Sequence, residues 1–141
     1  MYKSVMDFNS KRNGFKYDEE LEVKMFTEEV REFYDATTLA ERIDAIVDCY
    51  YVKTGTQMKL AYNNRKLELP YVDSTGLMYN ILLDEVKDEQ KLNEIILKAT
   101  DIVCKANELK GNKLVNGKVS KDGFNIPVTK QIEDMIKDVL G

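Results

Sequence analysis

The chain has 141 residues, a formal net charge of −4 and a pI near 5.0, and 33% of its residues are charged. This length suits one domain with a hydrophobic core, and we expect residues 1–141 to form a single domain. The acidic balance argues against nucleic acid or an anionic membrane as a partner. The absence of histidine excludes histidine-ligated zinc sites and nucleophiles that histidine activates.

Both cysteines, Cys49 and Cys104, lie in apolar helical patterns and have no CxxC partner. We therefore expect buried free thiols and a reducing compartment. The N-terminal residues lack the apolar core of a signal peptide. No apolar stretch is long enough to span a membrane. Together these features predict a cytoplasmic protein with no membrane partner.

Helical periodicity in the first half of the chain predicts three helices, over about residues 2–12, 18–36 and 38–60. Asp18 is the expected cap of the second helix, and Thr37 or Thr38 caps the third. Because the connection between these two helices is very short, we expect them to be antiparallel neighbours.

The second half of the chain begins with a loop over residues 63–73. Ser74 or Thr75 is expected to start a fourth helix that reaches Val86, and Asp88 opens a longer one that ends by residue 111. Thr129 is expected to cap a last amphipathic helix. No stretch alternates clearly enough to predict a strand, so the fold class is all-α.

Carboxylates cluster on the second and third predicted helices. The first helix of this pair carries Glu28, Glu29 and Glu32. Residues three and four apart share a helix face, so Glu29 and Glu32 point the same way. Both fall within the apolar arc, where a charge costs several kcal/mol unless it is paired or bound to metal. The alternative is a solvated acidic face, the usual fate of glutamate.

The next helix carries Glu41, Asp44 and Asp48 on one narrow stripe. Aspartate is a poor helix former, and two aspartates one turn apart repel each other. Glu41 also complements the helix dipole, so its role is ambiguous. Carboxylates that face each other across a helix hairpin suit Mg²⁺, with Mn²⁺ as a substitute. The spacing therefore predicts a metal site.

A second group of polar residues lies at the end of the long fifth helix and in the segment after it. Asn107 and Lys110 lie near its end, and Lys121 lies in the polar segment beyond. One interpretation is a phosphate clamp of lysine charges and an orienting amide. The other is a basic helix end that balances the dipole, followed by solvated lysines. Tyr51 adjoins the acidic stripe, where it lines the pocket or packs in the core.

These motifs resemble the all-α nucleoside triphosphate pyrophosphohydrolases, a superfamily that includes MazG, the dimeric dUTPases and phosphoribosyl-ATP pyrophosphohydrolase. Its signature is EExxE on one helix and ExxD on the next, often continued as DxxY. Glu28, Glu29 and Glu32 match the first half. The second half matches in two registers, as Glu41 to Asp44 or as Asp48 to Tyr51. We favour the latter, in which Ala45 replaces the expected glutamate.

The segment from residue 105 to residue 121 is similar to the tail of single-domain MazG-like proteins, which helps to hold the phosphates of the nucleotide. The resemblance covers the chain from Phe8 to about Pro127. It implies a MazG-like helical bundle around a four-helix core, assembled as a homodimer or homotetramer. It also implies Mg²⁺-dependent hydrolysis of a nucleoside triphosphate to the monophosphate and pyrophosphate.

The resemblance assigns a role to each candidate residue. Metal ligands would be Glu29, Glu32, Asp44 and Asp48, with Glu41 as the alternative to Asp44. Glu28 or Glu32 would position or deprotonate the attacking water. Phosphate and sugar contacts would come from Asn107, Lys110, Lys121 and Tyr51.

Three alternatives remain open. The first is a phosphoribosyl-ATP pyrophosphohydrolase or another hydrolase of narrow specificity. The second is a helical adaptor whose acidic face binds a basic partner. The third is an inactive relative that binds nucleotides without cutting them, which the departure at Ala45 keeps open.

Overall fold

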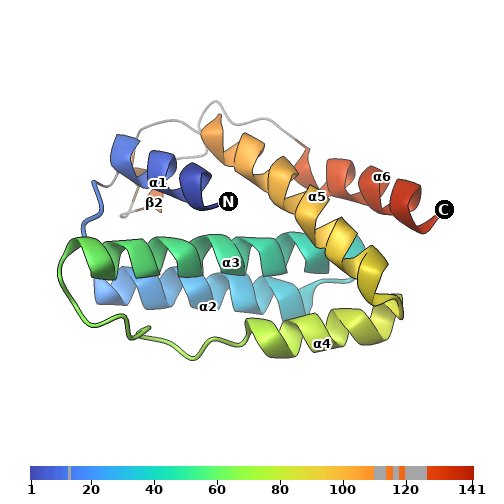
Figure 1. The fold of residues 1–141 in the computed structure, drawn as a ribbon, viewed down its shortest axis with the longest axis horizontal. Coiled ribbons are helices and arrows are strands. Elements are labelled where there is room, and N and C mark those ends of the chain that lie inside the picture. The colour runs from blue at the N-terminus through green and yellow to red at the C-terminus, as the bar shows by residue number, and fades with distance from the viewer. Residues whose placement is uncertain (13, 110–113, 116–117, 120–126) are drawn as a thin grey trace.

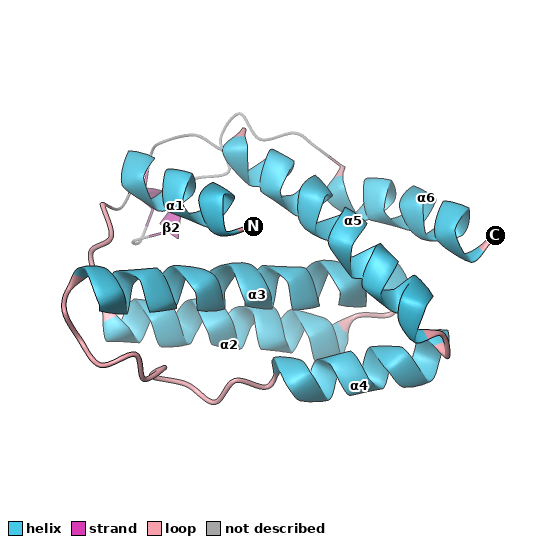
Figure 2. Cartoon of the chain, viewed as in Figure 1, coloured by secondary structure: helices cyan, strands magenta, loops and turns pink. Residues whose placement is uncertain are grey.

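In a computed structural model the chain is described for residues 1–12, 14–109, 114–115, 118–119 and 127–141 (Figure 1). These residues form an all-helical domain with one minimal hairpin of two strands (Figure 2). The helices are α1 (Tyr2–Lys11), α2 (Glu19–Asp35), α3 (Leu39–Tyr62), α4 (Thr75–Val86), α5 (Glu89–Glu108) and α6 (Val128–Leu140). The strands are β1 (Leu114–Val115) and β2 (Lys118–Val119), which pair antiparallel.

Helix α3 is the centre of the fold. It contacts α1, α2, α4, α5 and α6, and its most extensive contact is the antiparallel hairpin with α2 (Figure 1). Ile43, Ile46 and Val47 of α3 are fully buried at the middle of the main hydrophobic core. The predicted all-α class and the predicted pairing of these two helices are therefore confirmed.

Side-chain caps place most helix starts where the sequence predicts them. The Asp18 side chain accepts a hydrogen bond from the backbone N of Leu21 over 3.3 Å, and Thr38 Oγ1 accepts one from Glu41 N over 3.2 Å. Asp88 caps α5 in the same way through Lys91 N, over 3.0 Å. These bonds satisfy backbone donors that no helical carbonyl can reach.

One predicted start is wrong in detail. Helix α6 begins at Val128, after Pro127, so Thr129 lies inside the first turn and is not its cap. The predicted start of α4 at Ser74 or Thr75 is confirmed, because the helix begins at Thr75 with Ser74 at the N-cap position, although Ser74 makes no side-chain cap bond. Asp73 takes that role, because its Oδ1 accepts from both the backbone N and the hydroxyl of Thr75. The β1–β2 pair was also not predicted, since two-residue strands are too short to show alternation.

A second, smaller core lies beneath α1. Val5 of α1 packs there with Tyr51 and Met58 of α3 and Cys104 of α5. Val5 and the buried Asn9 lie over Gly55 of α3, where a Cβ atom would be 3.6 Å from Val5 Cγ1 and 3.5 Å from Asn9 Nδ2. This core ties the N-terminal helix to α3 and α5.

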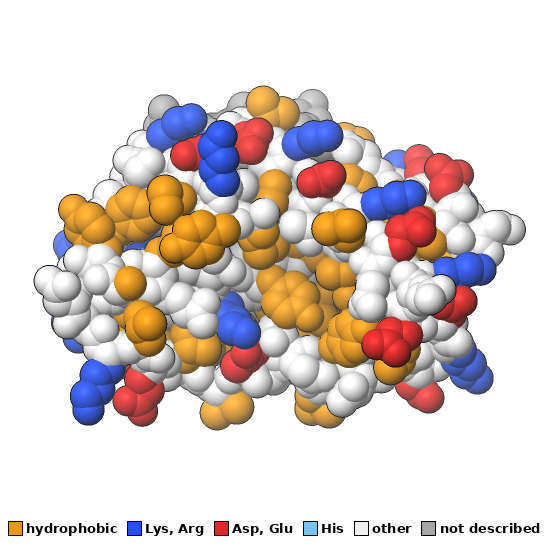
Figure 3. Space-filling view, viewed as in Figure 1, with side chains coloured by type: hydrophobic (Ala, Val, Ile, Leu, Met, Phe, Trp, Pro, Cys, Tyr) orange, Lys and Arg blue, Asp and Glu red, His pale blue; other side chains and the backbone are white. Residues whose placement is uncertain are grey.

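The surface mixes charge of both signs. Figure 3 shows basic and acidic side chains spread over one face of the molecule, with apolar side chains between them. Among the helices that the structure describes, none is both long enough and apolar enough to cross a membrane. Cys49 and Cys104 are free and buried, as the sequence predicts.

Candidate metal centre

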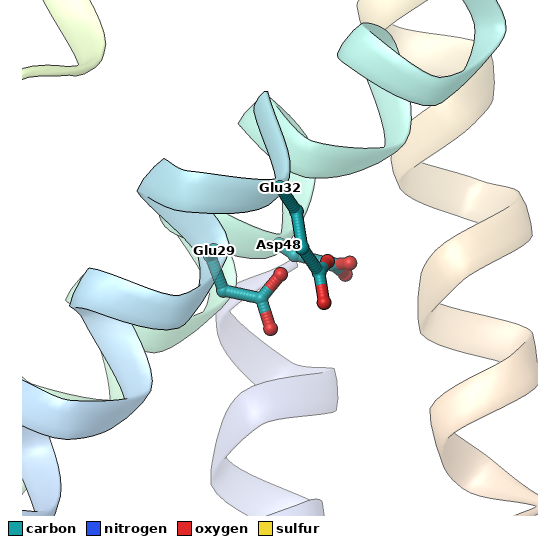
Figure 4. A group of neighbouring side chains, drawn as sticks. All are labelled: Glu29, Glu32 and Asp48. Atoms are coloured by element: carbon teal, nitrogen blue, oxygen red, sulfur yellow. The ribbon is translucent and has the colours of Figure 1, made fainter. Parts of the chain in front are cut away.

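Three carboxylates converge at the α2–α3 interface. Glu29 and Glu32 extend from α2, and Asp48 extends from α3. One oxygen from each side chain lies within 4.8 Å of the other two. Figure 4 shows the three side chains directed toward one another from the two helices. The spacing of three residues in α2 puts both glutamates on one side of the helix, opposite Asp48 of its antiparallel neighbour.

The environment of this group is partly closed. Glu29 and Asp48 are half-buried, and Oε2 of Glu29 is shielded from solvent. Glu32 is exposed, so the prediction that it lies on the apolar face of its helix is wrong. It stands at the edge of the α2–α3 contact, where solvent and a ligand can reach it.

The donor set fits a hard divalent cation. Three carboxylate oxygens at this separation offer the ligand type that Mg²⁺ and Mn²⁺ prefer, and their mutual repulsion favours a cation between them. Burial raises the pKa of the Cys49 thiol far above its usual value, and the negative charges of Glu29 and Asp48 raise it further. That thiol is therefore protonated at neutral pH and is a poor ligand.

The other two predicted metal ligands lie outside this group. Glu41 belongs to the cap of α3, where its Oε1 accepts hydrogen bonds from the hydroxyls of Thr37 and Thr38 over 3.1 and 3.0 Å. Asp44 is half-buried one turn before Asp48. The structure thus brings together Glu29, Glu32 and Asp48, while Glu41 is engaged as a capping residue.

Glu28 lies on a different side of α2 from its neighbour Glu29. It is half-buried and lines an open groove along α2 together with Glu20, Lys24 and Arg31. It contributes no oxygen to the three-carboxylate group. Of the two glutamates predicted to handle the attacking water, only Glu32 therefore has an oxygen within the group.

Tyr51 faces α1 in this structure. Its hydroxyl donates to the backbone O of Ser4 over 3.3 Å and lies 3.2 Å from Ser4 Oγ, and its ring meets Phe8 edge-on. Burial raises the pKa of Tyr51 to about 12, although the bond to Ser4 opposes that shift. Of the two roles expected for Tyr51, packing in the core is confirmed, and its place in the predicted pocket is not, because the side chain holds α1 against α3.

Asn107 is buried in the last turn of α5. Lys110 and Lys121 lie outside the residues that the structure describes. The proposed phosphate contacts of these lysines stay predictions.

One buried carboxylate was not predicted from the sequence. Glu22 has 0% of its surface exposed and lies two turns before Glu29 on the same side of α2. The signal was available, because Glu22, Phe26, Glu29 and Phe33 follow one helical stripe. Phe26 and Phe33 are both buried, which favours burial of Glu22 at the start of the same stripe.

No family model matches the chain, and no curated protein or solved structure matches it significantly.

Proposed function

We propose that the protein is a Mg²⁺-dependent nucleoside triphosphate pyrophosphohydrolase of the MazG-like type. Water would attack the α-phosphorus, and the bond between this phosphorus and the bridging oxygen would break, giving the nucleoside monophosphate and pyrophosphate. The observation that carries the proposal is the convergence of Glu29, Glu32 and Asp48 within 4.8 Å. The order of these residues along the chain also matches the motif resemblance.

Glu29, Glu32 and Asp48 would hold the cation, with Asp44 one turn away as the candidate fourth ligand. The cation would neutralise phosphate charge during phosphoryl transfer. Glu32 is the favoured group to accept the proton of the attacking water, because it is exposed and within the group. Glu28 is the alternative from the same motif.

The leaving pyrophosphate needs positive charge as its own charge develops. We assign this role to Lys110 and Lys121, and the orientation of phosphate or sugar to Asn107, on the motif resemblance alone. Base and sugar preference do not follow from these residues.

We also propose that the enzyme is a homodimer or homotetramer in the cytoplasm. Leu67, Val72, Leu77 and Leu97 are each more than half exposed, which leaves apolar surface for another copy. The two free thiols support a reducing compartment. Light scattering on the active protein tests the assembly, and a dilute monomer with full activity would contradict it.

A second candidate function is nucleotide binding without hydrolysis. Its support is Ala45, which stands where the DxxY register of the motif expects a glutamate and which is buried in the main core. A site that lacks one ligand would retain the nucleotide and lose the reaction.

The decisive assay is release of pyrophosphate from each common deoxynucleoside triphosphate, with Mg²⁺ and with chelator. We expect Mg²⁺-dependent release from the wild type and a loss of at least 100-fold in Glu32→Gln, by analogy with the loss of a general base. Glu20→Gln removes a charge from the exposed side of the same helix and is the matched control. Binding without release in the wild type would favour the second candidate.

A further inference from the structure

Besides the three-carboxylate group, helices α2 and α3 share a buried ion pair between Glu22 and Lys59. Glu22 and Lys59 are 0% and 3% exposed. Glu22 Oε2 lies 2.9 Å from Lys59 Nζ, and Thr56 donates a hydrogen bond to Glu22 Oε1 over 2.8 Å. Both oxygens of one α2 carboxylate are therefore bound by side chains of α3. Among the residues whose burial the structure describes, Lys59 is the one buried cation.

The loop before α4 closes over this contact. The Tyr71 hydroxyl donates to Thr56 Oγ1 over 2.8 Å. The Tyr71 ring stacks on Phe26 with ring centroids 4.0 Å apart and planes 9° apart. Phe26 lies one turn from Glu22 and one turn from Glu29 on α2. One layer of side chains therefore separates the buried ion pair from the carboxylate group.

The position of the pair along the hairpin is informative. Glu22 precedes Glu29 by seven residues, which is about 10 Å along the helix axis. At the opposite end, residues 36–38 form the short connection between α2 and α3, where Thr38 caps α3. The three-carboxylate group thus lies between the closed end of the hairpin and the buried pair.

The carboxylates of this group repel one another, and the repulsion favours separation of the two helices at their open end. The pair opposes that movement. Splaying or rotating α2 would separate Glu22 from Lys59 and leave both charges inside the protein without their hydrogen bonds, which is strongly unfavourable. A buried ion pair of this kind adds little to the free energy of unfolding, but it strongly disfavours other alignments of the two helices, because those would break the pair.

We propose that Glu22 and Lys59 are positioning residues, which hold α2 and α3 in the alignment that keeps Glu29 opposite Asp48 for a divalent cation. Neither residue belongs to the three-carboxylate group. The inference rests on the proposed function, because it takes the carboxylate group to be a metal site.

The test is the affinity for Mn²⁺, measured by electron paramagnetic resonance well below the unfolding temperature of every variant. Glu22→Gln and Lys59→Gln should each weaken binding at least tenfold. Since the two residues act as one unit, the double variant should bind about as weakly as either single variant. Ile132→Val is the control, because it removes a methyl group from the core at α6 and should change the affinity less than twofold.

Thr56 provides gentler variants if the charge changes prevent folding. Thr56→Val removes the hydroxyl bond to Glu22 and should weaken Mn²⁺ binding about threefold, whereas Thr56→Ser keeps the hydroxyl and should restore it. Wild-type affinity in Glu22→Gln, or in Thr56→Val, would overturn the positioning role and leave the metal site standing. Failure of the wild type to bind Mn²⁺ would instead refute the proposed function and this inference with it.

Discussion

Replacing Glu32 with glutamine should have opposite effects on stability with and without metal. The three carboxylates lie within 4.8 Å of one another, and at that distance two charges in water repel by about 0.9 kcal/mol. The water value applies because Glu32 is exposed. It faces two other carboxylates, and salt screens part of the repulsion. We therefore expect Glu32→Gln to be about 1 kcal/mol more stable than the wild type in chelator at low salt.

Metal should reverse that order. A ligand at 100 times its Kd stabilises the folded state by about 2.7 kcal/mol, which is about 5 to 11 °C in Tm for a domain of this size. The wild type should show this shift with Mn²⁺, and the variant should show a small fraction of it because one ligand is missing.

Differential scanning calorimetry in chelator and in Mn²⁺ measures both effects. Glu20→Gln again serves as the control for the loss of a charge from the same helix. Equal shifts with Mn²⁺ in the wild type and in Glu32→Gln would refute the reasoning, because the cation would then bind elsewhere. Lower stability of Glu32→Gln in chelator would show that the charge of Glu32 is favourable in the absence of metal.

Three further predictions concern the scaffold. Thr38→Ala removes the cap of α3 and should cost about 1 kcal/mol in urea unfolding, and no loss would argue against the cap. Burial acts to raise the pKa of Asp73, but hydrogen bonds from Lys53 and Thr75 outweigh it and hold that pKa below 3.8. The charged Asp73 carboxylate therefore stabilises the folded state above pH 3.8, and this stabilisation is lost as the pH falls below that value. Asp73→Asn should be less stable than the wild type by about 0.5 kcal/mol at pH 7. Urea titrations should show this difference in stability narrowing toward pH 3. Cys49 is fully buried and burial raises the pKa of its thiol, so a disulfide reagent should label it only on unfolding, and fast labelling of native protein would contradict its placement.

Local chemistry made much of the helical framework predictable. Asp18, Thr38 and Asp88 each precede an apolar periodic run, and each accepts the backbone hydrogen bond that a capping residue must accept. Thr129 has the same appearance, yet α6 starts at Val128, two residues before the start that a Thr129 cap would give, with Pro127 at the N-cap position. Proline is tolerated at this position because the N–H groups at the start of a helix have no helical partner, so the one that proline lacks is not missed.

Side-chain burial was harder to predict than helix position. Periodicity groups Glu29 with Glu32, but it does not say where the edge of the α2–α3 contact falls, and the structure leaves Glu32 exposed. Glu22 was not among the predicted site residues, and glutamate is usually exposed. Its burial depends on Lys59, which is 37 residues away and meets it only when the hairpin closes. A pairing of that kind follows from the register of two helices, which no local pattern contains.

The most direct test of the central claim is crystallographic. An anomalous difference map from a crystal soaked in Mn²⁺ should contain a peak among Glu29, Glu32 and Asp48, within coordination distance of an oxygen from each. A map without such a peak, with the three carboxylates turned toward bulk solvent, would contradict the metal centre and the hydrolase proposed from it.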